Sequence, residues 1–168
     1  MKQGSTEVSI RPIRPADDPQ VQEIVCGTLG EFGCTGEGFA AADPEVEAMS
    51  AAYPGGDARF FVLARGDEVV GCGGFSRLAG SDPEAAICEL QKMYFRPEVR
   101  GQGLGRRFLA FLLAEMRDGG YRRSYLETTT QMHAAQHLYR AFGFRPVPHA
   151  MGATGHHGCD RFYLLDLS

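Results

Sequence analysis

One stretch, residues 87–109, constrains the fold of this chain more than any other. It begins with apolar and β-branched residues that run to Phe95, and Pro97 interrupts this pattern. Three glycines at alternate positions follow, and an apolar face with helical spacing begins directly after them. The predicted order is therefore a strand, a glycine-rich turn and the N-terminus of a helix. Backbone N–H groups and the positive end of a helix dipole then converge on one place, which suits an anion.

The glycine-rich turn does not fit two common phosphate-binding motifs. The dinucleotide fingerprint needs a third glycine where Arg106 stands, and the chain has no Gly-Lys-Ser/Thr tripeptide of the P-loop kind. The turn does fit the pattern Arg-x-x-Gly-x-Gly, which is filled by Arg100, Gly103 and Gly105. A glycine-rich turn without a ligand is the alternative interpretation. The preceding strand, the surrounding arginines and the following helix favour a bound polyphosphate.

Length and composition limit the class of protein. The 168 residues fit a single domain, 1–168, and the net charge of −4 comes without a basic patch, so we expect no nucleic-acid partner. The N-terminus is polar and no apolar run approaches the ~20 residues of a membrane span, so we expect no membrane partner and a cytoplasmic location. The odd number of cysteines and the lack of a C-x-x-C motif indicate reduced thiols. The cysteines are Cys26, Cys34, Cys72, Cys88 and Cys159.

The rest of the chain alternates strand and helix patterns in the order β-α-α-β-β-β-α-β-α-β-β. Strands are expected at residues 8–14, 60–65, 69–75, 87–95, 124–128, 144–150 and 160–167. Helices are expected at residues 16–33, 43–52, 104–118 and 132–143. The second helix would begin with Asp43 as its N-cap and Pro44 at its first helical position. These patterns predict a mixed α/β fold.

Two segments resemble the GCN5-related N-acetyltransferase (GNAT) superfamily. Residues 100–105 are similar to the family's loop for the pyrophosphate of acyl-CoA. Residues 134–147, AAQHLYRAFGFRPV, are similar to its second CoA-binding helix. The resemblance extends from end to end and is greatest to bacterial small-molecule members. It implies the single-domain GNAT fold, a mixed central β-sheet flanked by helices, with acetyl-CoA (coenzyme A) as cosubstrate and no metal.

The resemblance also implies which residues contact the cofactor. A bulge in the central strand would leave backbone N–H groups near residues 93–95 free for the acetyl oxygen and the pantetheine arm. One departure is Met132, which stands where many relatives carry an asparagine that binds the pantetheine; Gln131 or His133 could replace that contact. The expected CoA-binding residues are Met93, Tyr94, Phe95, Arg100, Gly101, Gln102, Gly103, Leu104, Gly105 and Arg106.

Acetyl transfer to an amine needs a base and an acid. An alkylamine has a pKa of ~10.4 and must lose a proton before it attacks the thioester. Glu89, where some relatives carry a catalytic glutamate, is our candidate base. A water chain, an orienting carboxylate or an ion pair with Lys92 are the alternatives. Tyr139 occupies the family's position for the acid that protonates the CoA sulfur, and the alternative is a tyrosine that only packs in the core.

The segment GATGHHGCDRF gathers His156, His157, Cys159 and Asp160. Their spacing matches no zinc signature, so we expect no metal there. We expect a loop on the substrate side, with His156 and His157 as substrate contacts whose imidazoles would suit a polar or carboxylate-bearing acceptor. A solvated turn, or a Cys–His nucleophile pair, is the alternative. Glu31, in a GEFG segment similar in style to small-molecule members, is a further candidate substrate contact.

The sequence therefore predicts an acetyl-CoA-dependent N-acetyltransferase. The expected acceptor is the primary amine of a small or amino-acid-like molecule, which attacks the thioester directly in a ternary complex. A protein or peptide N-acetyltransferase and a non-catalytic acyl-CoA-binding module are the alternatives. The Gly-rich segments 33–38 and 76–84 could close over a small ligand, whereas a polypeptide acceptor would need an open groove. A homodimer is possible, as in other members of the family.

Overall fold

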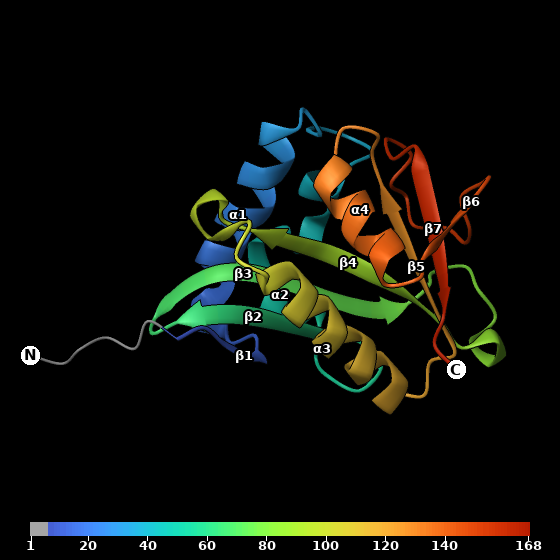
Figure 1. The fold of residues 1–168 in the computed structure, drawn as a ribbon, viewed down its shortest axis with the longest axis horizontal. Coiled ribbons are helices and arrows are strands. Elements are labelled where there is room, and N and C mark those ends of the chain that lie inside the picture. Colours follow the sequence, from blue (N-terminus) through green and yellow to red (C-terminus); the bar gives the residue numbers. More distant parts are fainter. Residues whose placement is uncertain (1–6) are drawn as a thin grey trace, which may run out of the picture.

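Two parallel strands lie at the centre of the sheet. In the computed structural model, which describes residues 7–168, seven strands form one sheet in the order β1-β2-β3-β4-β5-β7-β6 (Figure 1). Neighbouring strands are antiparallel except β4 and β5. The strands are β1 (Ser9–Pro12), β2 (Arg59–Arg65), β3 (Glu68–Arg77), β4 (Ile87–Phe95), β5 (Arg123–Thr128), β6 (Arg145–Val147) and β7 (Arg161–Asp166).

Helices connect the strands in the predicted order. Within the described residues they are α1 (Asp18–Glu31), α2 (Met49–Ala52), α3 (Leu104–Asp118) and α4 (His133–Ala141). This order confirms the mixed α/β fold expected from the sequence. None of the helices in residues 7–168 is long and apolar enough to cross a membrane.

Strand β2 shows how the sheet separates two layers of core. Phe60 and Val62 belong to a cluster with residues of α1, whereas Phe61 and Leu63 belong to a cluster with residues of α3 and α4. Successive side chains of a strand point to opposite faces, so the continuous apolar run of β2 buries both. The buried stripe of α3 consists of Phe108, Leu109, Leu112, Leu113 and Met116. Helices therefore cover both faces of the sheet.

The helix expected over residues 43–52 is largely wrong. Residues Pro44–Ala48 form a 3-10 turn, and only Met49–Ala52 form an α-helical turn. Asp43 has the extended backbone of an N-cap, but its side chain caps no amide. Its carboxylate instead contacts Lys92 and His156, which are remote in sequence. Because the Asp43 carboxylate forms these tertiary ion pairs, it does not act as the N-cap of a regular helix.

The strand expected at residues 144–150 is also shorter than predicted. Strand β6 covers only Arg145–Val147 and lies at the edge of the sheet. Pro146 has no N–H to give to a neighbouring strand, and Pro148 follows directly. Proline is tolerated at an edge, where one side of the strand needs no partner. The two prolines therefore account for both the position and the shortness of β6.

Candidate active site

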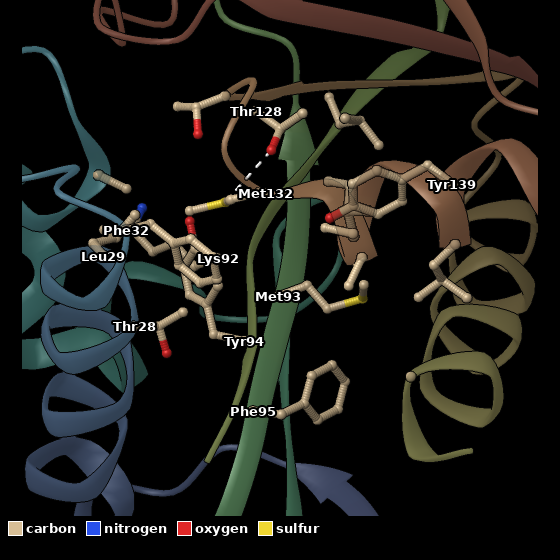
Figure 2. Close-up of a pocket in the computed structure, with 18 of the residues that line it drawn as sticks. Thr28, Leu29, Phe32, Lys92, Met93, Tyr94, Phe95, Thr128, Met132 and Tyr139 are labelled. Atoms are coloured by element: carbon tan, nitrogen blue, oxygen red, sulfur yellow. Dashed lines mark hydrogen bonds between the residues drawn. The ribbon is translucent and has the colours of Figure 1, made fainter. Parts of the chain in front are cut away.

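The central strands separate part-way along their length and open a cavity. Parallel pairing of β4 with β5 covers Ile87–Glu89 only and ends where Glu89 faces Tyr125. Beyond that point the two strands diverge (Figure 1). The resulting cavity has a volume of about 310 Å³ and is lined from β4, β5, α1 and α4. Figure 2 shows α1 with Thr28, Leu29 and Phe32 on one side of β4, and Tyr139 of α4 on the other.

A bulge in β4 lies in the wall of this cavity. Cys72 faces Tyr94 and Gly74 faces Gln91, so residue 73 on β3 faces two residues on β4. Lys92, inside the bulge, has a φ of 52°, in the left-handed region. Such a backbone is uncommon outside glycine and is often found at functional sites. The bulge that the family resemblance implied is therefore present.

The glycine-rich turn joins this wall to α3. Gly101 and Gly103 have φ values of 77° and 81°, which favour glycine. Gly105 lies against α4, because a Cβ there would come within 3.2 Å of Leu138 Cδ2. Gly101, Leu104 and Gly105 line the cavity, so the N-terminus of α3, with its free backbone N–H groups, lies at the cavity wall.

The structure divides the expected cofactor contacts into two groups. Met93, Tyr94, Phe95, Arg100, Gly101, Leu104 and Gly105 line the cavity. Gln102 and Gly103 of the turn, and Arg106 in the first turn of α3, are not among the lining residues. Met93 and Tyr94 point to opposite sides of β4 (Figure 2). Residues of the loop and of the strand therefore line the same cavity.

Glu31 lies beside this loop. Its Oε2 is 2.7 Å from Arg100 Nη1, and the same guanidinium donates from Nε and Nη2 to the Phe95 carbonyl. Glu31 does not line the cavity. The structure thus places this candidate substrate contact next to a candidate phosphate-binding arginine.

Glu89 is buried, with 4% of its surface exposed. Its Oε1 accepts a hydrogen bond from Gln91 Nε2 at 2.5 Å. The Gln91 carbonyl oxygen accepts from Tyr53 Oη and Ser76 Oγ, which directs the amide group toward Glu89. No ion pair joins Glu89 to another described residue, so the alternative of a Glu89–Lys92 pair is not seen. Burial raises the pKa of Glu89.

A second buried carboxylate, Glu127, was not predicted from the sequence. It lies on β5, its side chain is 3% exposed, and it accepts hydrogen bonds from Tyr125 Oη (2.9 Å) and from the Thr154 hydroxyl. Polar atoms of Glu89, Glu127 and His156 lie within 4.8 Å of one another. The sequence did carry one signal for Glu127: it is a charged residue inside the otherwise apolar segment SYLET, which forms the strand parallel to β4.

His156 is held by Asp43, a carboxylate that is remote in sequence. Its Nε2 lies 2.8 Å from Asp43 Oδ2, and that oxygen also lies 3.0 Å from Lys92 Nζ. The hydrogen bond to Asp43 raises the pKa of His156, while the same partners lower the pKa of Asp43. Lys92, with a side chain 1% exposed, also pairs with Glu45 at 3.2 Å. Three elements remote in sequence thus meet at the bulge.

Residues 150–159 form the wall of a second cavity, of about 360 Å³. It shares Glu127, His156 and Cys159 with the first cavity. His157 lines only the second one and packs against Gly38. Asp160 turns away and accepts hydrogen bonds from the backbone N–H and hydroxyl of Thr130. The four adjacent residues of the GHHGCD segment therefore do not surround one point.

Tyr139 lies on α4 with 7% of its surface exposed, and its hydroxyl points into the first cavity (Figure 2). No hydrogen bond from another described residue reaches that hydroxyl. Burial raises the pKa of the phenol, so the group stays protonated at neutral pH. The hydroxyl oxygen is open to the cavity, so a ligand bound there could accept its proton.

Met132 also faces the cavity, where relatives carry an asparagine. Its sulfur accepts a hydrogen bond from Thr128 Oγ1 at 3.5 Å (Figure 2). Gln131 and His133 are exposed and do not line the cavity. Neither side chain therefore occupies the position of the missing amide.

The comparisons with known proteins agree with this geometry. The family model for the acetyltransferase (GNAT) family matches residues 31–144. The chain belongs to this family. It is 36% identical over 159 residues to the uncharacterized N-acetyltransferase YjgM of Escherichia coli K12, covering 94% of each chain.

Solved structures show the same fold. An acetyltransferase of the GNAT family from Staphylococcus aureus Mu50 gives a TM-score of 0.84 at 19% identity, over 96% of this chain and 100% of that one. The acetyltransferase yncA from Salmonella typhimurium, solved with acetyl-CoA, gives 0.73 at 21% identity, over 96% and 94%. The protein is therefore a GNAT N-acetyltransferase with acetyl-CoA as its acetyl donor.

Proposed function

We propose that the protein transfers the acetyl group to the primary amine of a small molecule by direct attack in a ternary complex. One observation carries this proposal: the Glu89 carboxylate and the unpartnered Tyr139 hydroxyl line one cavity, which meets a second cavity at Glu127 and His156. A donor in the first cavity and an acceptor in the second would bring thioester and amine together between these groups.

Contacts between two loops over the second cavity support a small acceptor rather than a polypeptide. Gly158 donates its N–H to the Gly38 carbonyl at 2.9 Å, and the ring of Phe39 packs against Gly158. The Asp43–His156 contact joins the same two loops at a second point. An extended polypeptide acceptor would need a groove that runs past the site, and these contacts lie across such a path. Residues 34–43 and 150–160 are therefore the segments that would select the acceptor by size.

The residues in place account for each proton transfer. Glu89 accepts a proton from the ammonium group of the acceptor, and the neutral nitrogen then forms a bond to the thioester carbon. Backbone N–H groups of β4 beyond the bulge stabilise the negative charge on the carbonyl oxygen. As the carbon–sulfur bond breaks, Tyr139 donates its hydroxyl proton to the sulfur. The nitrogen of the intermediate loses its second proton, which restores the Tyr139 hydroxyl, and Glu89 releases the first proton to solvent. The products are the N-acetylated acceptor and the free thiol of CoA.

The test is a turnover screen with acetyl-CoA against a panel of small amines and a panel of peptides with free N-termini. Thiol release and product mass are measured together. We expect N-acetylated small amines. Faster acetylation of peptides would favour the polypeptide alternative. A melting temperature raised by acetyl-CoA, with no product from either panel, would favour a non-catalytic binding module.

A further inference from the structure

The acceptor end of the site is rich in carboxylates, and the described residues leave no unpaired lysine or arginine there. Glu89 and Glu127 line it, and Asp43 and Glu45 lie behind it, paired with Lys92. The facing cationic groups are Lys92 and, when protonated, His156. With every group ionised, four negative charges face two positive ones. This excess of negative charge bears on which acceptor can bind, and the inference rests on the function proposed above.

Both cations are already engaged. Lys92 is almost fully buried and lies within 3.2 Å of oxygens of both Asp43 and Glu45. His156 directs Nε2 to Asp43 at 2.8 Å. Arg100 also lines the first cavity, but it pairs with Glu31 beside the glycine-rich turn. A carboxylate on the acceptor would therefore find no unpaired lysine or arginine in the described lining.

Among the described residues, Glu89 and Glu127 have only His156 as a nearby cationic group, and His156 is hydrogen-bonded to Asp43. Their hydrogen-bond donors are neutral groups, from Gln91 to Glu89 and from Tyr125 and Thr154 to Glu127. His156 Nδ1 lies 3.9 Å from Glu127 Oε1, longer than a hydrogen bond. A buried carboxylate is costly unless a positive charge compensates it. The pair thus defines a place for a cationic group.

Two further observations mark that place as a ligand site. The hydroxyl of Tyr139, the acid of the proposed function, points into the cavity that Glu89 and Glu127 also line. The second cavity continues from Glu127 and His156, and apart from these residues and His157 its walls are small or apolar. They include Ala150, Met151, Ala153 and Phe162.

We propose that the acceptor is an amine without a carboxylate near its amino group: its ammonium group sits between Glu89 and Glu127, and its uncharged body extends into the second cavity. Glu127 is then a specificity-determining residue, which attracts the ammonium and repels acidic acceptors. This selects alkylamines and arylalkylamines over amino acids. It differs from the carboxylate-bearing acceptor that the two histidines suggested in the sequence, because His156 is committed to Asp43.

The test compares acceptors that differ only in a carboxylate. Pentylamine is paired with norleucine, and phenethylamine with phenylalanine, at saturating acetyl-CoA. Two like charges a few ångströms apart repel strongly in a partly buried site. We therefore expect kcat/KM to be at least ~10-fold higher for each amine than for its amino acid.

Glu127→Gln tests the assigned residue, and Glu68→Gln at the tip of the β2–β3 hairpin is the matched control. Glu127→Gln should shrink the amine-to-amino-acid ratio several-fold and leave the KM for acetyl-CoA unchanged, while Glu68→Gln should preserve both. A purely structural defect would lower both rates and keep the ratio. The comparison on the wild-type enzyme stands even if Glu127→Gln does not fold.

The outcomes separate this inference from the proposed function. Equal or better acetylation of the amino acids would overturn the inference and leave small-amine acetylation intact. A carboxylate preference that His157→Ala abolishes would do the same and would identify His157 as the anchor. If a folded Glu127→Gln variant keeps the wild-type ratio of amine to amino-acid kcat/KM, Glu127 does not determine specificity. Transfer to no member of either pair, together with no transfer to other small amines, would overturn both.

Discussion

Burial determines what each polar side chain of the cavity can do. It raises the pKa of Glu89, which makes the carboxylate a stronger base than an exposed one. It also raises the pKa of Tyr139, which keeps the hydroxyl proton available for a leaving thiolate. Both shifts come chiefly from desolvation, because neither side chain forms an ion pair within the described residues. For Glu89 this gives a base closer in strength to the amine that it would deprotonate, and for Tyr139 an acid that keeps its proton.

Glu89→Gln should lower kcat by roughly 10²-fold, the usual range for loss of a general base. The KM for acetyl-CoA should stay near the wild-type value, because the glycine-rich turn is remote from the carboxylate. In the wild type, kcat/KM should rise as Glu89 ionises. Since its pKa is raised, that rise should occur above the ~4.3 of an ordinary glutamate. Rates measured against pH check this, with Glu68→Gln as the control. Near-normal turnover of Glu89→Gln would assign the base to water.

Tyr139→Phe should keep the melting temperature close to that of the wild type, since the hydroxyl has no hydrogen bond to lose within the described residues. It should slow turnover with acetyl-CoA. The deficit should shrink with a thioester whose thiol is more acidic, because that leaving group needs less protonation. Rates for both donors are compared in both proteins. The same deficit for the two thioesters would leave Tyr139 as a packing residue only.

At this scale the sequence predicted single residues better than their partners. Glu89 and Tyr139 were predicted because each occupies a position in a motif; both line the cavity, and their catalytic roles stay predictions. Glu127 was missed because it meets the cavity only where β5 leaves β4, and Asp43 because its partner His156 is 113 residues away. Contacts between loops distant in the chain have no periodicity to reveal them.

The strand, turn and helix from Ile87 to Asp118 act as one element. The bulge opens the wall, two glycines turn the chain in left-handed conformations, and a third allows α3 to approach α4 closely. The boundaries of β4 and α3 were predicted correctly because they rest on local signals: apolar runs, Pro97 and the glycines. The helix over residues 43–52 failed because tertiary ion pairs decided the conformation there.

Gly103→Asp should abolish most of the thermal stabilisation by acetyl-CoA. At a ligand concentration ~100 times the dissociation constant, a ligand that binds only the folded state adds about 2.7 kcal/mol. A carboxylate at residue 103 would face the pyrophosphate. Gly103→Asn is the matched control, because it has the same size and the same φ of 81° to adopt but no charge. Differential scanning fluorimetry with and without acetyl-CoA measures both. An equal shift in the two variants would exclude charge repulsion.

The Asp43–His156 pair links two loops and should make stability depend on pH. The pKa of His156 is raised in the fold, so its contribution is complete below the unfolded value of ~6.5 and is lost as pH rises through the folded value. The pKa of Asp43 is lowered, so its contribution appears above ~3.9 and is lost only in acid.

Above neutral pH the wild type should therefore lose more stability than Asp43→Asn or His156→Asn. Denaturant unfolding at a series of pH values measures this, with the exposed Asp57→Asn as the control. The same slope in all four proteins would show that the contact does not persist in solution.

On the scale of the whole molecule, the fold brings two loops from opposite ends of the chain over the separated centre of the sheet. Residues 34–43 follow α1, residues 150–160 precede β7, and they meet where β4 and β5 part. The two cavities share Glu127, His156 and Cys159 as a common wall. The fold class could be predicted because each element carries its own pattern. The meeting of these two loops could not be predicted, since it depends on single contacts between irregular segments.

This shared wall predicts sequential kinetics. Both substrates should be bound before transfer, so initial rates at several fixed acceptor concentrations should give intersecting double-reciprocal lines. A covalent route through Cys159 would give parallel lines and an acetylated cysteine. Burial raises the pKa of the Cys159 thiol to about 12, which leaves almost no thiolate at neutral pH. Cys159→Ala should therefore retain at least half of the activity, and mass spectrometry of the wild type with acetyl-CoA alone should find no acetylated peptide containing Cys159. Parallel lines together with an inactive but folded Cys159→Ala would refute direct transfer.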